Sequence, residues 1–290
     1  MTIEGYFTPY RKMLGDCWDL DLGSAGPLLI PRTPFLVSGG KEGILYVLDR
    51  SHMGGYDDAG AAWSFNVVKD MFRSGFMHSQ IPADDPSFDR VQQKFQVGEN
   101  RYEADYAACV LMKWPHIHGT PAFARFDAQH AYMFVWPEKD SLKRYEWKGE
   151  RFDRPPERGS ALAPPNKEDP LKCFDSDHPE RARLNGMPGG MLSVNIDPTE
   201  PSLGVVLASV KICDAAGYPK CDDSQHFGVL RAYDPFTMQE VWSNQCTPQE
   251  VSSNQCEDKK YWFAKFVPPT VAAERIFLPT ASGKVLIYGP

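Results

Sequence analysis

Residues 228–242 constrain the fold of this chain more than any other stretch, because they combine two strand patterns with a turn. Along residues 229–234 the side chains alternate in character, which is the period of a strand whose two faces meet different surroundings. Asp234 and Pro235 then supply a turn, since the Asp carboxylate accepts hydrogen bonds from the backbone ahead of it and Pro fixes φ. A second short strand ends at Trp242, so we predict a hairpin covered by an aromatic side chain.

Weaker copies of this pattern recur along the chain, although a single hairpin of this kind occurs in many β proteins. Each copy runs from a Gly- or Pro-rich segment, here called a lead-in loop, into a short strand of small residues and then into hydrophobic strands. We expect four such groups, at residues 19–98, 114–153, 186–245 and 264–290. A four-stranded sheet cannot bury both of its faces alone, so repeated sheets stack around an axis. The sequence therefore predicts one all-β domain, a β-propeller of four-stranded antiparallel blades.

Three segments interrupt this repetition and are expected to be insertions, at residues 57–89, 154–180 and 211–224. The first of them shows some helical period around residues 63–71, and residues 91–97 after it are a strand candidate. The last group lacks a fourth strand. We expect residues 4–9, with Tyr6 and Phe7, to complete it, as an N-terminal segment commonly closes a propeller.

Composition agrees with an all-β globular protein. The chain is 42% hydrophobic and 24% charged, and its 25 Pro, 23 Gly and 12% aromatic residues suit many short strands joined by turns. The net charge of −7, with no offsetting basic run, argues against binding to nucleic acid or anionic lipid. No stretch approaches the roughly 20 apolar residues of a membrane span, and the first residues lack a secretory signal. We expect a monomer.

The seven cysteines suggest disulfides but do not decide the compartment. Cys213 with Cys221 and Cys246 with Cys256 each bracket a short polar loop that a disulfide would brace. Such bridges would indicate an extracellular or periplasmic protein. The odd count leaves free thiols in the cytosol as the alternative, and no Cys-x-x-Cys pair suggests zinc.

Residues 228–242 resemble the repeat of pyrroloquinoline-quinone-type (quinoprotein) β-propellers, in which a Gly-x-Leu-x-Ala-x-Asp strand leads through a turn to a Trp. The resemblance covers most of residues 19–288, but those propellers have more blades, so it implies a truncated member or one that lost blades. It also implies a central channel whose mouth is surrounded by the lead-in loops. Here these are residues 39–42, 114–121, 186–190 and 264–269.

The sharpest functional signal lies in the second lead-in loop. His116 and His118 are spaced so that, on a strand, both imidazoles project from one face and could share a metal ion or a proton. The alternative is that they bind backbone carbonyls, and since no acidic ligand lies within the motif we assign no metal site. Glu138 and Asp140, which flank Lys139, are candidate acid/base groups or calcium ligands, or else the charged tip of a hairpin.

Other lead-in residues suit ligand binding. Lys41 and Lys265 could bind a carboxylate or a quinone oxygen as point charges, or be solvated loop residues. Gly189 and Gly190 allow the backbone to approach either a ligand or the neighbouring blade closely.

These features leave three hypotheses for function. The first is a secreted-type quinoprotein-like scaffold that binds a small-molecule or protein ligand at the channel mouth and has no intact cofactor site. The second is a quinoprotein dehydrogenase that oxidises an alcohol or sugar with pyrroloquinoline quinone and calcium. The family usually covers the quinone with a ring of two adjacent cysteines, and none are adjacent here. The third is a hydrolase or lyase that uses His116 and His118 with Glu138.

Overall fold

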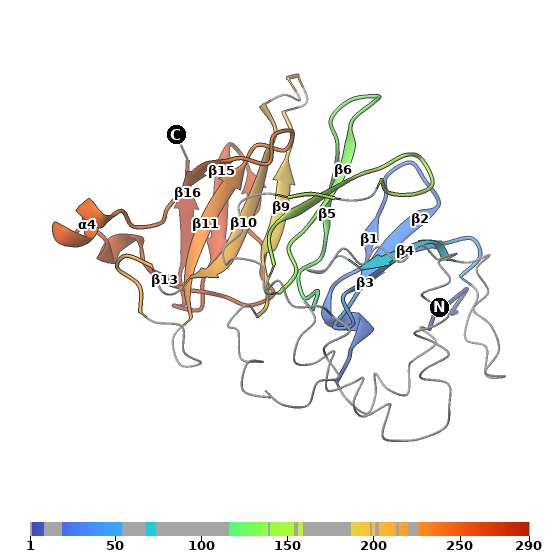
Figure 1. Ribbon diagram of the computed structural model, residues 1–290, viewed down its shortest axis with the longest axis horizontal. Helices are drawn as coiled ribbons and strands as arrows, with labels where there is room; N and C mark the ends of the chain where they lie inside the picture. Colours follow the sequence, from blue (N-terminus) through green and yellow to red (C-terminus); the bar gives the residue numbers. More distant parts are fainter. Residues whose placement is uncertain are drawn as a thin grey trace.

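The protein is all-β, with four antiparallel sheets and little helix (Figure 1). The computed structural model describes residues 2–8, 19–53, 68–73, 116–138, 140–153, 156–158, 187–197, 199–200, 203–212, 215–219 and 226–289, with the backbone alone at 68–73 and 158. The helices in this part of the chain are η1 (Leu22–Ser24), α4 (Pro248–Ser252) and η5 (Glu257–Lys259).

Strands that follow one another in the chain pair with one another in each sheet. The first sheet contains β1 (Leu28–Leu29), β2 (Phe35–Gly39), β3 (Ile44–Asp49) and β4 (Val68–Arg73). The second contains β5 (Ala122–Arg125), β6 (Ala131–Val135), β7 (Lys143–Glu146) and β8 (Glu157–Arg158).

The other two sheets continue this order. The third contains β9 (Met191–Asn195), β10 (Val205–Ile212), β11 (Phe227–Tyr233) and β12 (Glu240–Ser243), and β13 (Tyr261–Trp262) also pairs with β11. The fourth contains β14 (Thr270–Ala272), β15 (Arg275–Pro279) and β16 (Val285–Tyr288).

The sheets pack face to face in series, and β6 shows why the sequence requires this. All five residues of β6 are buried, although successive side chains of a strand point to opposite faces. Met133 and Val135 pack in a cluster with Val37 and Val47 of the first sheet. On the other face of β6, Tyr132 and Phe134 pack in a separate cluster with side chains of the third sheet, among them Val206, Ala208, Val229 and Tyr233. A strand apolar on both faces needs a neighbouring sheet on each side.

The third sheet repeats this arrangement at β11. Val229 and Tyr233 pack toward the second sheet, whereas Leu230 packs with Tyr261 and with Leu278 of the fourth sheet. The sheets therefore follow one another in chain order, from β1–β4 at one end of the molecule to β14–β16 at the other (Figure 1).

The predicted hairpin at residues 228–242 forms with the expected turn chemistry. The Asp234 carboxylate accepts hydrogen bonds from the backbone amides of Phe236 (2.9 Å) and Thr237 (2.7 Å). Trp242 lies edge-on to Tyr288 of the fourth sheet, with ring centroids 5.7 Å apart. The aromatic residue thus contacts the next sheet.

Several predicted boundaries differ from the structure. Val68–Met71, within the supposed insertion and its helical period, belong to strand β4, because pairing with β3 overrides the local pattern. β8 likewise lies within the expected insertion at 154–180, so the second sheet extends past residue 153. The strand candidate at 91–97 lies outside the described residues.

Phe7 lies against the first sheet and not the last. Its ring centroid is 5.3 Å from that of Tyr46, and it packs with Ile44 and Leu48 of β3. The N-terminal end of the chain is also drawn far from β16 (Figure 1). The expectation that Phe7 helps to complete the last sheet is therefore wrong, because β3 presents an apolar face there.

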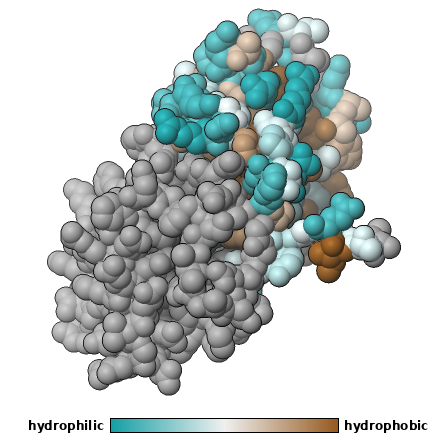
Figure 2. Space-filling view, turned by 90° about the vertical axis from the view of Figure 1, so that its right-hand side faces the viewer, coloured by the Kyte–Doolittle hydropathy of each residue, from teal (hydrophilic) through white to brown (hydrophobic). Residues whose placement is uncertain are grey.

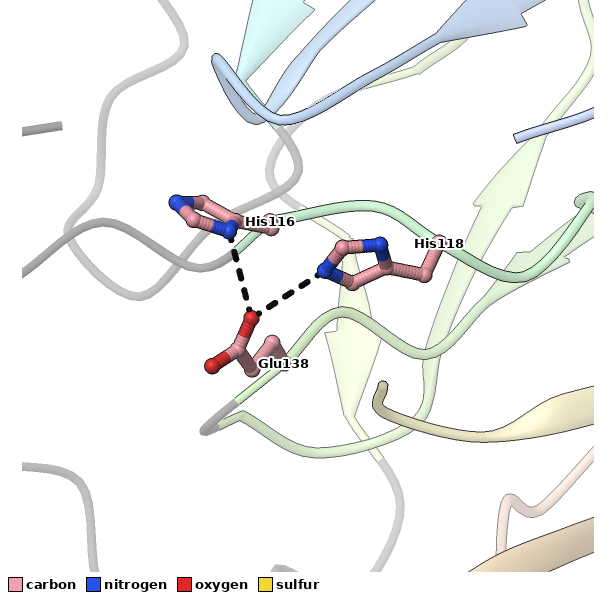
Figure 3. A group of neighbouring side chains, drawn as sticks. All are labelled: His116, His118 and Glu138. Atoms are coloured by element: carbon pink, nitrogen blue, oxygen red, sulfur yellow. Dashed lines mark hydrogen bonds and ion pairs between the residues drawn. The ribbon is translucent and has the colours of Figure 1, made fainter. Parts of the chain in front are cut away.

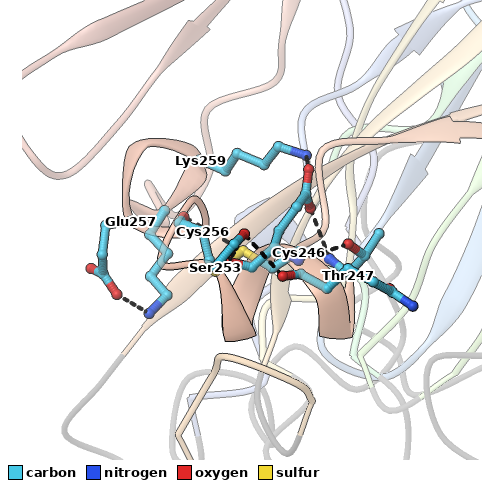
Figure 4. The surroundings of a disulfide bond; sticks show 9 residues. Cys246, Thr247, Ser253, Cys256, Glu257 and Lys259 are labelled. Carbon is cyan, nitrogen blue, oxygen red and sulfur yellow. Dashed lines mark hydrogen bonds and ion pairs between the residues drawn. A yellow bond between two sulfur atoms is a disulfide. The ribbon is translucent and has the colours of Figure 1, made fainter.

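One predicted disulfide is present. Cys246 and Cys256 are bonded and buried, and they enclose α4, whose N-cap Thr247 forms a capping box with Glu250 (Figure 4). Cys213 and Cys221 lie outside the described residues.

The surface near the first sheet is largely hydrophilic where the structure describes it, with scattered apolar residues (Figure 2). At the other end of the molecule, Val285 and Ile287 of β16 are more than half exposed. Among the described residues, no helix has the length and apolar character needed to span a membrane.

Candidate functional site

The four segments predicted as lead-in loops approach one another around His118. Residues 39–42 are in fact the turn between β2 and β3, so the first of these segments does not lead into its sheet as expected. The backbone amide of Ile117 donates to the carbonyl of Gly40 (3.1 Å), which joins the second loop to the first. A Cβ added to Gly119 would lie only 2.5 Å from the Gly190 carbonyl oxygen, so the second loop is in close contact with the third. Phe266 of the fourth loop lies beside His118, with ring centroids 5.9 Å apart.

His116, His118 and Glu138 form a buried cluster at this meeting point (Figure 3). Glu138 Oε2 lies 3.3 Å from His116 Nδ1 and 3.3 Å from His118 Nε2. The three side chains are 9%, 2% and 8% exposed for His116, His118 and Glu138. One carboxylate oxygen therefore faces both imidazoles in a place with little water.

The two histidines reach Glu138 from an irregular segment, since residues 116–121 precede β5 and are not part of a strand. Their rings are 5.6 Å apart at 64° and point toward the same oxygen (Figure 3). The expectation that both imidazoles project from one strand face is thus wrong in its geometry. Their convergence on one point is nevertheless observed.

Backbone hydrogen bonds fix this segment in place. The Glu138 amide donates to the His116 carbonyl (2.8 Å), and the Ser24 hydroxyl donates to the Ile117 carbonyl (2.7 Å). Together with the bond from Ile117 to Gly40, these contacts hold the histidines before any ligand arrives. Such preorganisation lowers the ordering cost of binding.

Lys41 is paired within the protein. Its ammonium lies 2.6 Å from the Asp19 carboxylate and 2.8 Å from the Asp21 carboxylate. Burial lowers the pKa of Lys41, but hydrogen bonds and charges from the two carboxylates outweigh this and raise it overall. The hydrogen bond from Lys41 in turn lowers the pKa of Asp19, and the nearby His116 adds a smaller lowering effect. Lys41 therefore links the 39–42 segment to residues 19–21 through ion pairs with Asp19 and Asp21.

The predicted glycines serve packing between sheets. A Cβ on Gly189 would meet the Trp136 carbonyl oxygen at 2.3 Å, and one on Gly190 would meet the Trp136 ring at 2.9 Å. Gly189 also has φ of +83°, which favours glycine. Of the two uses expected for these residues, close approach to the neighbouring sheet is the one observed. Lys265 is exposed and adjoins Phe266 in the fourth loop.

Glu138 and Asp140 are buried, so they are not a solvated hairpin tip. Asp140 binds the ammonium of Lys143, whose side chain is fully buried. Lys139 lies outside the described residues. Nothing in the sequence distinguishes the buried Asp140–Lys143 ion pair from charged residues at the surface. The sequence also gives no sign that Phe266 lies beside His118.

No protein-family model matches the sequence, and no curated protein is significantly similar to it. The chemistry of the site therefore has to be judged from its geometry. Two imidazole nitrogens facing one carboxylate oxygen can share protons, as in general acid–base pairs. The same three atoms are also of the types that hold divalent transition metals, so Glu138 supplies the acidic ligand that the His-Ile-His motif lacks.

Proposed function

We propose that the four sheets are consecutive blades of a quinoprotein-like β-propeller and that the protein binds a small molecule where the lead-in loops meet. The observation that carries this proposal is the convergence of all four loops around His118. The series of face-to-face sheets supports the blade interpretation, since the second and third sheets each use a neighbouring sheet on both faces to bury their apolar residues.

Loops carried on rigid sheets are a common place for binding sites. In this protein the place where the loops meet combines the aromatic ring of Phe266 with the polar side chains of His116, His118 and Glu138. The buried disulfide favours an extracellular or periplasmic protein, because such bonds persist in oxidising compartments.

Thermal denaturation with a compound panel tests the proposal. The panel contains monosaccharides, dicarboxylates, amino acids, and pyrroloquinoline quinone with calcium, because a ligand that binds only the folded protein raises its Tm. The expected result is a compound that stabilises the wild type but not the Phe266→Ala or His118→Ala variants. His130→Ala is the matched control, since His130 lies in the β5–β6 turn at the other end of β5.

One result would contradict binding at the loops, and another would replace the scaffold hypothesis with an enzymatic one. If every compound that binds raised the Tm of the wild type and of all three variants equally, the binding site would lie away from the loops. Bound quinone together with reduction of an electron-accepting dye would instead make the protein a quinoprotein oxidoreductase.

A second candidate is hydrolysis or elimination by the same residues. The observation that favours it is the short distance of Glu138 Oε2 from both imidazoles, since a carboxylate orients and charges a histidine base. Turnover of an ester, phosphoester or uronate substrate by the wild type would support this candidate if the Glu138→Gln variant loses the turnover and the His130→Ala variant retains it. Turnover unaffected by Glu138→Gln would eliminate it.

A further inference from the structure

We infer that His116 Nδ1, His118 Nε2 and Glu138 Oε2 form a binding site for one divalent transition-metal ion, with Zn²⁺ as the representative. Metal binding at this cluster goes beyond ligand binding at the loops, and either can hold without the other. The inference rests on the position of three ligand atoms, their burial and their chemical type.

The three atoms lie at separations close to those of a metal centre. Zn²⁺ binds imidazole nitrogen at about 2.0–2.1 Å in tetrahedral geometry, which places neighbouring ligand atoms about 3.3 Å apart. The two nitrogen–oxygen distances are each 3.3 Å, and all of the ligand atoms lie within 4.8 Å of one another. The largest adjustment needed is therefore at most about 1.5 Å, between the two imidazole nitrogens.

The donor set selects the class of metal. Two imidazoles and one carboxylate suit Zn²⁺ and other first-row divalent ions, whereas Ca²⁺ and Mg²⁺ take oxygen ligands almost exclusively. This site is therefore chemically distinct from a calcium site. Three protein ligands also leave at least one coordination position open, as in metal sites that bind a further ligand.

Isothermal titration of the chelator-treated protein with Zn²⁺ tests the inference. We expect one Zn²⁺ per chain at this site, and affinity at least about 100-fold weaker in His116→Ala, His118→Ala and Glu138→Gln, since even outer-shell changes cost about 10- to 100-fold. His130→Ala should bind as the wild type does, because His130 pairs with Asp127 on the surface, 46% exposed. Ca²⁺ should not compete.

X-ray absorption at the zinc edge keeps the test valid if a variant fails to fold. Zinc-loaded wild-type protein should show two imidazole ligands and an oxygen at about 2.0–2.2 Å. Absence of Zn²⁺ binding, a sulfur-ligated spectrum, or affinity unchanged in all three variants would overturn the site.

Discussion

At the scale of single residues, the interior of the second sheet contains a charge that the fold has to neutralise. Lys143 is fully buried on β7, and its ammonium contacts the carboxylate of Asp140. The Asp140 carboxylate also accepts a hydrogen bond from the Ser141 amide (2.7 Å), which fixes its orientation. A buried ion pair adds little net stability, but removing one partner leaves the other as an uncompensated buried charge, which is strongly destabilising.

Lys143→Met should therefore destabilise the protein strongly. We expect a loss of about 3–5 kcal/mol in the free energy of unfolding, measured by denaturant titration, because the Asp140 carboxylate loses this counter-ion. Lys148→Met in the same region is the matched control, since Lys148 pairs with Glu146 at the surface. A similar effect for both substitutions would show that the buried pair carries no special weight.

Close glycine contacts between sheets position His118. Gly119 faces the Gly190 backbone at a distance that leaves no room for a methyl group, and backbone atoms yield less readily than side-chain ends.

Gly119→Ala should reduce the free energy of unfolding by about 1–3 kcal/mol and weaken Zn²⁺ binding, because the strain falls on the residue beside His118. Gly23→Ala should change stability by less than about 0.5 kcal/mol, since nothing lies within 4 Å of its added Cβ. Denaturant titration and calorimetry measure the two effects. Equal stability of both variants would mean that the loops can separate.

At the scale of elements, the segment between β12 and β13 depends on a covalent link. The Cys246–Cys256 disulfide closes a loop with a sequence separation of 10 that holds α4, a helix of five residues with no buried side chain. Chain entropy predicts about 3 kcal/mol of stabilisation for a loop of this size.

The Cys246→Ser/Cys256→Ser double variant should lose about 2–4 kcal/mol of unfolding free energy. Thr247→Ala, which removes only the N-cap, should lose about 1 kcal/mol. Thermal denaturation with and without a reducing agent gives the comparison. If the reductant does not lower the Tm of the wild type, the bridge is not stabilising the fold.

The sequence predicts the elements whose patterns are local. Alternation in β11 and the turn at Asp234 need only neighbouring residues, and both are present. The sequence does not predict β4, because its strand conformation depends on pairing with β3. All three residues of the cluster are candidates from the sequence, His116 and His118 by their spacing and Glu138 as an acid/base group, and the structure brings them together. What the sequence does not show is that the turn after β6 carries Glu138 to the two imidazoles.

At the scale of the whole molecule, face-to-face packing of successive sheets explains how distant segments meet. Apolar residues hold each sheet against the next one in the series, and the second and third sheets are packed in this way on both faces, so the loops that precede them are held in fixed places. His118 then has neighbours from the third and fourth sheets, although Phe266 is far from it in sequence. The proposed ligand site depends on this convergence, whereas the three proposed metal ligands all lie in the segments before β5 and after β6 of the second sheet.

A nuclear Overhauser measurement between the rings of His118 and Phe266 tests the convergence most directly. Their centroids are 5.9 Å apart, and Phe126 and Tyr132 within the second sheet, 5.8 Å apart, provide an internal reference. We predict cross-peaks for both pairs in protein with labelled aromatic rings. A cross-peak for Phe126 and Tyr132 without one for His118 and Phe266 would contradict the meeting of the loops.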